Sequence, residues 1–234
     1  MNRNKLVAIC LMMAISLSMI GYAYAAWTDL VTIKGTVAMG SLTLAWDDFE
    51  PPLATEWHVD PVTGSLVVGE YLDKDIAYAE AYWDLDSEVY DEHSDKYGYK
   101  SFWILVENAY PQLYVRTTYV LHNIGTIPVM VYGLEITGVK EDHTGAFVCD
   151  VIYDPALMGV FEDYNGNGVK DPEENVVINM EWVNGVFPYQ LEPCTINKGE
   201  FDMDFKQEAQ ECHTYILHVR VLGVQWNKLY EVGP

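Results

Sequence analysis

The feature that most constrains the fold of this chain is an alternation of apolar and polar residues with a period of two. Side chains of a β-strand point alternately to opposite faces, so this period predicts strands with one buried face. The alternation recurs in four segments: 42–46, 115–122, 176–182 and 215–222. A nearly continuous apolar run at 101–106 predicts a strand covered on both faces.

Turn residues separate these segments, for example Asn165–Gly168 and Asn184–Gly185. The best helical candidate, Lys206–Glu211, is short, and the acidic segment Asp84–Asp95 is expected to be an exposed loop. Many short strands divided by turns are typical of a β-sandwich or barrel. No repeat or low-complexity linker divides the chain. Residues 26–234 are therefore predicted to form a single all-β domain.

The first 25 residues have the layout of a secretory signal peptide. A basic start is followed by an apolar stretch from Leu6 to Ile20 and by the small residues Ala23 and Ala25. A retained membrane anchor is the alternative, but the apolar stretch is shorter than the ~20 residues of a membrane span. We expect cleavage of residues 1–25 and a secreted, extracellular mature chain that does not insert into a membrane.

The chain is strongly acidic, with a formal net charge of −22. Loss of Arg3 and Lys5 with the signal peptide changes this to about −24 (−22 minus 2). Such a surface repels nucleic acid and attracts divalent cations, which excludes nucleic acid as a partner. Apolar residues make up 50% of the chain and aromatic residues 13%, so a disordered chain is not expected.

Cysteine is scarce: after loss of the signal peptide, Cys149, Cys194 and Cys212 remain. An odd number favours one disulfide and one free thiol. Cys194 and Cys212 are the preferred pair because they are close in sequence, although spacing does not determine connectivity. Without a CxxC pair, a zinc ribbon is not expected.

The most specific motif is the segment Asp163–Glu174, which matches D-x-[DN]-x-[DN]-G-x5-E at each defined position. Calcium takes six to eight oxygen ligands, and this spacing supplies them as the chain curls. Gly168 permits the sharp turn in the middle of the loop. The predicted metal ligands are Asp163, Asn165, Asn167, the Val169 carbonyl, Asp171 and Glu174.

The residues that flank this motif do not predict the two helices of an EF-hand. The sequence after Glu174 alternates as a strand does, so we expect an EF-hand-like calcium loop between strands, with a structural ion. Asp202 and Asp204 share one face of a predicted strand, and they or Asp84–Asp95 offer a further cation site. A solvated acidic surface is the favoured interpretation of both.

Catalytic motifs are missing from the sequence. It contains no HExxH, GxSxG, GxGxxG or GxxxxGK[ST] pattern, and its six histidines are scattered. His122 and His218 fall on predicted strands, where a structural role is the favoured interpretation. We therefore expect no enzymatic activity and no catalytic residues.

Three short segments of the chain resemble the TasA/camelysin type of secreted proteins. The first is Ala26-Trp27-Thr28-Asp29 with the later Gly40-Ser-Leu42-Thr-Leu44 strand. The second, Asn123-Ile-Gly125-Thr-Ile-Pro128, is similar to an N-x-G-T-x-P turn of that group, and the third is Val224–Asn227. The group includes biofilm-matrix fibres and archaeal bundling pilins, and cannula-like subunits look related.

The resemblance implies a jelly-roll-like β-sandwich in which an N-terminal donor strand of one subunit completes the sheet of the next. The donor would be residues 26–37, unless that segment is the domain's own first strand. Some camelysin relatives are called metalloproteases, but the zinc motif is missing here. The anchors implied on this segment are Trp27, Leu30, Val31, Ile33 and Val37.

Two functions of different classes follow. The first is a calcium-stabilised structural subunit that assembles head to tail with copies of itself into an extracellular pilus, fibre or tube. The alternative is a monomeric cell-surface β-sandwich that binds polysaccharide or a protein partner, and a secreted hydrolase is a weaker third. The aromatic residues considered for a surface glycan are Tyr71, Tyr78, Tyr82, Trp83 and Tyr90.

Overall fold

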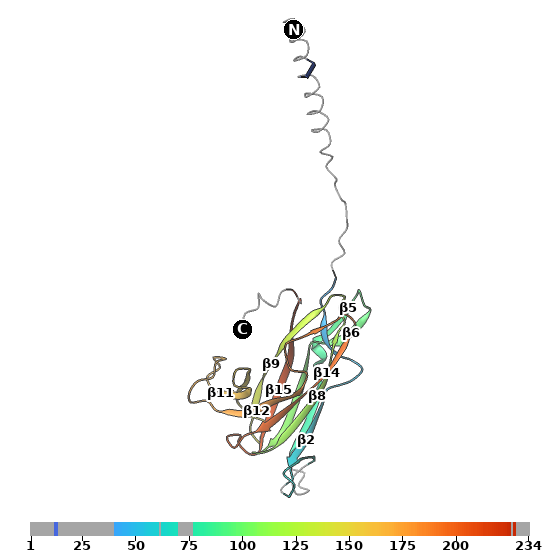
Figure 1. Ribbon diagram of the computed structural model, residues 1–234. Coiled ribbons are helices and arrows are strands. Elements are labelled where there is room, and N and C mark those ends of the chain that lie inside the picture. Colours follow the sequence, from blue (N-terminus) through green and yellow to red (C-terminus); the bar gives the residue numbers. More distant parts are fainter. Residues whose placement is uncertain (1–11, 14–39, 61, 70–76, 226, 228–234) are drawn as a thin grey trace. The chain divides into compact units, whose positions relative to one another are not determined.

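The computed structural model describes residues 12–13, 40–60, 62–69, 77–225 and 227 (Figure 1). The chain divides into two units, residues 1–39 and 40–234. The candidate donor strand 26–37 lies outside the described residues, and so does the signal peptide except for Met12 and Met13. The donor anchors that lie outside are Trp27, Leu30, Val31, Ile33 and Val37.

The second unit is almost entirely β-structure, which confirms the predicted all-β class. One short 3-10 helix, η2 (Leu85–Ser87), interrupts the strands of its described part. The strands are β1 (Leu44–Asp47), β2 (Leu53–Val59), β3 (Leu66–Val68), β4 (Tyr78–Trp83), β5 (Glu88–Asp91), β6 (Lys96–Tyr99), β7 (Ser101–Ala109), β8 (Tyr114–Asn123), β9 (Val129–Glu141), β10 (Phe147–Asp154), β11 (Gly159–Asp163), β12 (Val176–Asn184), β13 (Tyr189–Leu191), β14 (Ile196–Phe205) and β15 (His213–Gln225).

The strands form one antiparallel sheet in the order β4-β7-β15-β9-β10-β11-β12-β14-β8-β1-β6-β5. β2 and β13 attach to this path at β8 and β9, and β3 pairs with β2. Figure 1 shows the long strands β9 and β15 side by side, and they pair along nearly their whole length. The sheet curls so that its two halves face each other, as in a β-sandwich.

Aromatic contacts between the two halves mark the core. The Trp46 ring of β1 lies 4.9 Å from the Phe102 ring of β7, and the Phe205 ring of β14 lies 5.3 Å from the Tyr215 ring of β15. Neither strand pair shares a ladder of hydrogen bonds, so both contacts cross the interior. All four side chains are fully buried, and burial of each stabilises the fold by roughly 2 kcal/mol.

Strands occur in all five segments where the sequence predicts them, in β1, β7, β8, β12 and β15. The expectation that 101–106 is covered on both faces is only half correct. Phe102, Ile104 and Val106 are fully buried, whereas Trp103 and Leu105 are half-buried. One face of β7 therefore packs in the core and the other is partly open.

Two local predictions are wrong. Lys206–Glu211 forms turns instead of a helix: the Lys206 N–H donates to the Val177 carbonyl, and the Ala209 N–H donates to the Lys206 carbonyl in a turn. The segment 84–95 is not a simple exposed loop, because it contains η2 and β5. Asp91, at the end of β5, is only 3% exposed.

The expected disulfide is also wrong, because Cys149, Cys194 and Cys212 are all free. The Cys194 N–H donates to the Asn123 carbonyl at the end of β8, and the Cys212 N–H donates to the Ala109 carbonyl at the end of β7. The ten residues of β14 run between the two cysteines, and a strand of that length spans about 30 Å. Residues that are close in sequence thus lie beyond opposite ends of one strand.

Candidate metal centre

The Asp163–Glu174 loop connects β11 to β12, which pair with each other antiparallel. Asp163 is the last residue of β11, and Glu174 lies shortly before β12 begins. Both carboxylates are buried, with exposed fractions of 2% and 5%. The pairing of β11 with β12 therefore brings the two ends of the loop close together, and the acidic side chain at each end is buried.

The first half of the loop curls around the Asp163 carboxylate. Its Oδ1 accepts hydrogen bonds from the amides of Gly166 and Asn167, at 2.8 and 3.3 Å, and its Oδ2 accepts one from the Gly168 amide at 2.8 Å. Gly166 and Gly168 have φ angles of +68° and +75°, which glycine adopts without strain. The glycines thus allow successive amides to point at one carboxylate.

The two asparagines turn their side chains toward Asp171. The Asn165 and Asn167 amide groups donate to the Asp171 Oδ2 atom at 2.6 and 3.0 Å. Their carbonyl oxygens accept from backbone amides two residues further on, at 2.9 Å and 2.7 Å. Such local turns hold the side chains of Asn165, Asn167 and Asp171, the predicted ligands at positions 3, 5 and 9 of the loop, close together. To bind a cation here, the Asn165 and Asn167 side chains must turn so that their amide oxygens, and not their N–H groups, face the ion.

Glu174 closes the loop. Its Oε1 accepts from the Tyr164 amide at 3.2 Å, and its Oε2 accepts from the Asp171 amide at 2.8 Å. The ion pairs formed within the described part of the chain include none of Asp163, Asp171 or Glu174. Buried carboxylates are stable when they are hydrogen-bonded, paired with a cation or bound to a metal, and here only neutral donors are present.

A hollow of about 550 Å³ opens beside the second half of the loop, and Asn165, Asp171 and Glu174 line it. The Val169 side chain is exposed, and its amide donates to Asn167. Across the described residues, no three His, Cys, Asp or Glu side chains form a group that could hold a metal. A cation here would depend on mixed ligands, with carboxylates, amides and a backbone carbonyl together.

The sequence analysis did not predict a buried ion pair next to the start of the Asp163–Glu174 loop. Lys140 of β9 is fully buried and pairs with Glu162 of β11, the residue before Asp163. The Lys140 ammonium also donates to Gln210 at 3.1 Å, and the Tyr164 hydroxyl donates to the second Glu162 oxygen at 2.6 Å. This cluster ties the start of the loop to the centre of the sheet. The sequence does carry a signal for the buried Lys140. Leu134 and Ile136 of β9 point inward, and Lys140 is an even number of residues from both, so it lies on the same face.

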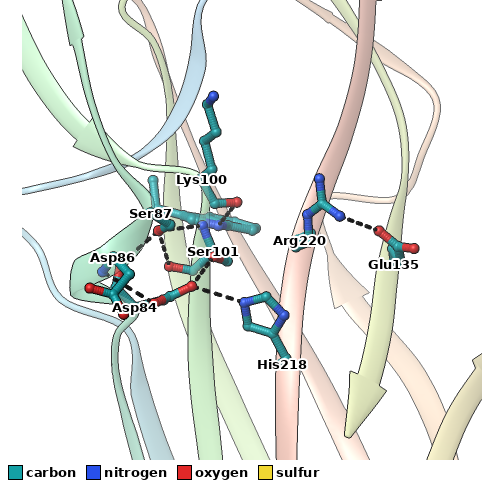
Figure 2. A network of polar contacts seen from close by, with 9 residues as sticks. Asp84, Asp86, Ser87, Lys100, Ser101, Glu135, His218 and Arg220 are labelled. Atoms are coloured by element: carbon teal, nitrogen blue, oxygen red, sulfur yellow. Dashed lines mark hydrogen bonds and ion pairs between the residues drawn. The ribbon is translucent and has the colours of Figure 1, made fainter.

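A second polar network joins η2 to β7 and β15 (Figure 2). The Ser101 hydroxyl donates to the Asp84 carboxylate at 2.6 Å, and the His218 Nε2 lies 3.1 Å from the same Asp84 oxygen. Burial alone would raise the pKa of Asp84, but these bonds and the Asp86 amide lower it. Ser101 donates to the carboxylate instead of the imidazole, so this is not the relay of a serine hydrolase. The network anchors η2.

The other acidic candidates have protein partners. Arg116 donates to both Asp202 oxygens at 2.7 Å, which neutralises that carboxylate without a metal. Burial raises the pKa of Asp204, and hydrogen bonds from Asn179 and Tyr114 oppose this rise. Asp202 and Asp204 therefore do not form a shared cation site.

Among the aromatic residues considered for glycan binding, Tyr78, Tyr82 and Trp83 lie on β4 and Tyr90 lies on β5. Tyr78, Tyr82 and Tyr90 are exposed by 48%, 41% and 44%, and the Tyr90 ring lies 4.6 Å from Tyr97. Trp83 stacks on Tyr99 at 5.0 Å, and Tyr71 lies outside the described residues.

No family model matches this chain, and neither the curated proteins nor the solved structures include a match. Among the residues that the structure describes, no helix is long and apolar enough to cross a membrane.

Proposed function

We propose that this chain is a structural subunit of an extracellular pilus, fibre or tube that assembles head to tail and is stabilised by calcium. In this proposal the curled sheet is a jelly-roll-like sandwich whose open edge accepts a strand from another copy. The resemblance to TasA/camelysin-type proteins supports the same assembly. The observation that carries the proposal is the edge formed by β4.

β4 ends the strand order and, among the described strands, forms a hydrogen-bonded ladder only with β7, while β2 packs close to its other side. Toward β2, the Ala79 amide of β4 is met by a side chain, the Glu56 carboxylate, at 2.7 Å. Large apolar side chains are exposed along these neighbouring strands: Leu53, Val59, Leu66, Val67, Val68, Tyr78 and Tyr82. An unpaired edge with exposed apolar side chains is a template for a strand of another chain.

The segment 26–37 has the pattern of a strand that could fill such an edge. Trp27, Val31, Ile33 and Val37 are an even number of residues apart, so an extended chain places them on one face. Added strands gain affinity from main-chain hydrogen bonds and specificity from alternate side chains in pockets. Donation from each copy to the next does not close on itself and yields a filament.

Calcium has two functions in this proposal. In the loop it binds the inward carboxylates of Asp163 and Glu174 and stiffens the connection between β11 and β12. On the surface, divalent cations reduce the repulsion between subunits that each carry about 24 excess negative charges. Millimolar calcium outside cells is sufficient for a site of modest affinity.

The test is negative-stain microscopy of the chain 26–234 with millimolar calcium and with a chelator. We expect filaments in calcium and none after deletion of residues 26–37. A synthetic peptide of residues 26–37 should raise the melting temperature of the deleted chain, because it supplies the missing strand. A peptide with Val31→Asp and Ile33→Asp is the matched control and should have no effect. A chain that stays monomeric at high concentration in calcium, or filaments that persist without residues 26–37, would contradict the proposal.

A further inference from the structure

The outer face of β2, β8, β14 and β12 presents a continuous row of side chains near one end of the sandwich. Trp57 is paired with Tyr114, Tyr114 with Asp204, and Asp204 with Asn179. Directly opposed residues of neighbouring strands point to the same face. Met203 and Phe205 flank Asp204 on β14 and are fully buried, so Asp204 and its row face outward.

A pocket of about 820 Å³ is formed where this row meets the turn before β8 and the loop after β14. Its volume lies within the range of about 300–1,000 Å³ that is typical of small-molecule sites. None of the residues proposed for calcium lines it. The lining residues are His58, Val59, Tyr110, Pro111, Gln112, Tyr114, Asn179, Asp204, Phe205, Lys206, Gln207 and Glu208.

The lining combines two kinds of surface. Tyr110 and Tyr114, with Val59 and Pro111, supply aromatic and apolar area. Trp57, whose ring centroid lies 4.6 Å from the Arg116 guanidinium, is on the same row but is not among the lining residues. Any aromatic stacking in the pocket therefore involves the two tyrosines.

The polar part of the pocket offers hydrogen-bond donors and acceptors. Burial raises the pKa of the half-buried Asp204, and hydrogen bonds from Asn179 and Tyr114 together with the positive charge of Lys206 oppose this rise. An ionised carboxylate has about four acceptor positions, so these two bonds leave room for a ligand. The amides of Asn179, Gln112 and Gln207 each offer both a donor and an acceptor.

The charge of the lining selects against anions. Asp204 and Glu208 are acidic, and Lys206 is the lining residue that carries a fixed positive charge. The chain as a whole has a formal charge of −22, which adds to the repulsion of phosphates and acidic ligands. The ligand that fits is neutral, rich in hydroxyl groups and partly apolar on one face.

We propose that this pocket binds a neutral oligosaccharide, with the sugar face against Tyr110 and Tyr114 and its hydroxyls donating to Asp204. None of the residues Asp163–Glu174 lines the pocket, whereas Val59 belongs both to the pocket and to the exposed apolar surface beside β4. Glycan binding by the pocket does not require filament formation, and it would give the subunit a means of attaching to glycans.

The test starts with the chain 26–234 on a glycan array that carries neutral hexose and N-acetylhexosamine oligomers beside uronate and sulfated oligomers. The best neutral oligomer is then titrated by calorimetry into the wild type and into Asp204→Asn and Tyr110→Ala. We expect each variant to bind about ten-fold more weakly or worse, because each loses a contact to the sugar.

Glu200→Gln is the matched control, since Glu200 is on the same outward face of β14 but outside the pocket. It makes the same change of charge as Asp204→Asn and should bind as the wild type does. Melting curves of all variants separate lost binding from lost folding, and Asp204→Asn preserves side-chain volume. The proposal is overturned by an absence of neutral binding at millimolar ligand, by binding to acidic oligomers alone, or by equal affinity in Asp204→Asn, Tyr110→Ala and the wild type.

Discussion

At the scale of single residues, the main electrostatic cost of the Asp163–Glu174 loop is the removal of its two terminal carboxylates from water. The Asp163 and Glu174 side chains are buried and accept only backbone N–H groups. Neutral donors offset part of the cost of removing a carboxylate from water, and a divalent cation would offset more. The loop should therefore be more stable with calcium than without it.

Glu174→Gln tests this directly, because it keeps the shape of the side chain and removes its charge. We expect calcium affinity to fall at least about ten-fold and the calcium-dependent rise in melting temperature to shrink accordingly. Glu173→Gln is the control, since Glu173 is exposed and is not a ligand in the motif. Calorimetry and melting curves give both quantities. Equal calcium responses of Glu174→Gln and the wild type would exclude the loop as the site.

The buried Lys140–Glu162 pair gives a second prediction. Lys140→Met leaves Glu162 buried without its cation, which should lower the free energy of unfolding by about 3–5 kcal/mol. The double variant Lys140→Met/Glu162→Gln should recover much of this loss, because the remaining amide is neutral and still accepts from Tyr164. Arg220→Met removes the exposed pair with Glu135 and should cost at most about 1 kcal/mol. Urea unfolding measures all three, and a small effect of Lys140→Met alone would show that Glu162 finds another partner.

At the scale of elements, regular alternation decided more than length whether the sequence revealed a strand: the four-residue β1 lies in a predicted segment, and the thirteen-residue β9 does not. β8 and β15 have ten and thirteen residues with regular alternation, and the alternation predicts them. β3 has three exposed apolar residues without alternation, and β5 lies in an acidic segment that looks like a loop. Strands without a regular alternation are formed by their neighbours more than by their own pattern, so local sequence does not reveal them.

The close pairing of β9 and β15 gives a prediction for an element. A Cβ at Gly138 of β9 would lie 2.1 Å from the Ile216 carbonyl oxygen of β15, so the backbones must separate to admit it. Gly138→Ala should lower the free energy of unfolding by about 1–3 kcal/mol or prevent folding. Gly133→Ala, on the same strand, meets nothing within 4 Å and is the control. Similar melting temperatures for both alanine variants would contradict this packing.

At the scale of the whole molecule, the sequence predicts the class of fold but not the order of its strands. β1 pairs with β8 and β6, which lie more than 50 residues further along the chain, and no local pattern identifies such partners. The same limit applies to the sites. The motif marks the residues of the Asp163–Glu174 loop because they are contiguous. The pocket around Asp204 draws on β2, β8, β12 and β14, and only the fold brings these strands together.

The charge of the whole chain leads to the final prediction. Any salt screens repulsion between subunits with about 24 excess negative charges, since the screening length is about 10 Å at 0.1 M. In the proposed function, only an ion that fits the Asp163–Glu174 loop would also stiffen the link between β11 and β12. Calcium accepts flexible oxygen shells, whereas magnesium requires a smaller octahedral one. At fixed ionic strength we therefore expect calcium to raise the melting temperature and promote assembly beyond the levels in sodium chloride, and magnesium to do so less than calcium. Melting curves and sedimentation of the chain 26–234 measure both effects.

Glu174→Gln in calcium should behave as the wild type does in sodium chloride. If sodium chloride matches calcium in both measurements, screening accounts for the whole effect and the loop has no part in assembly.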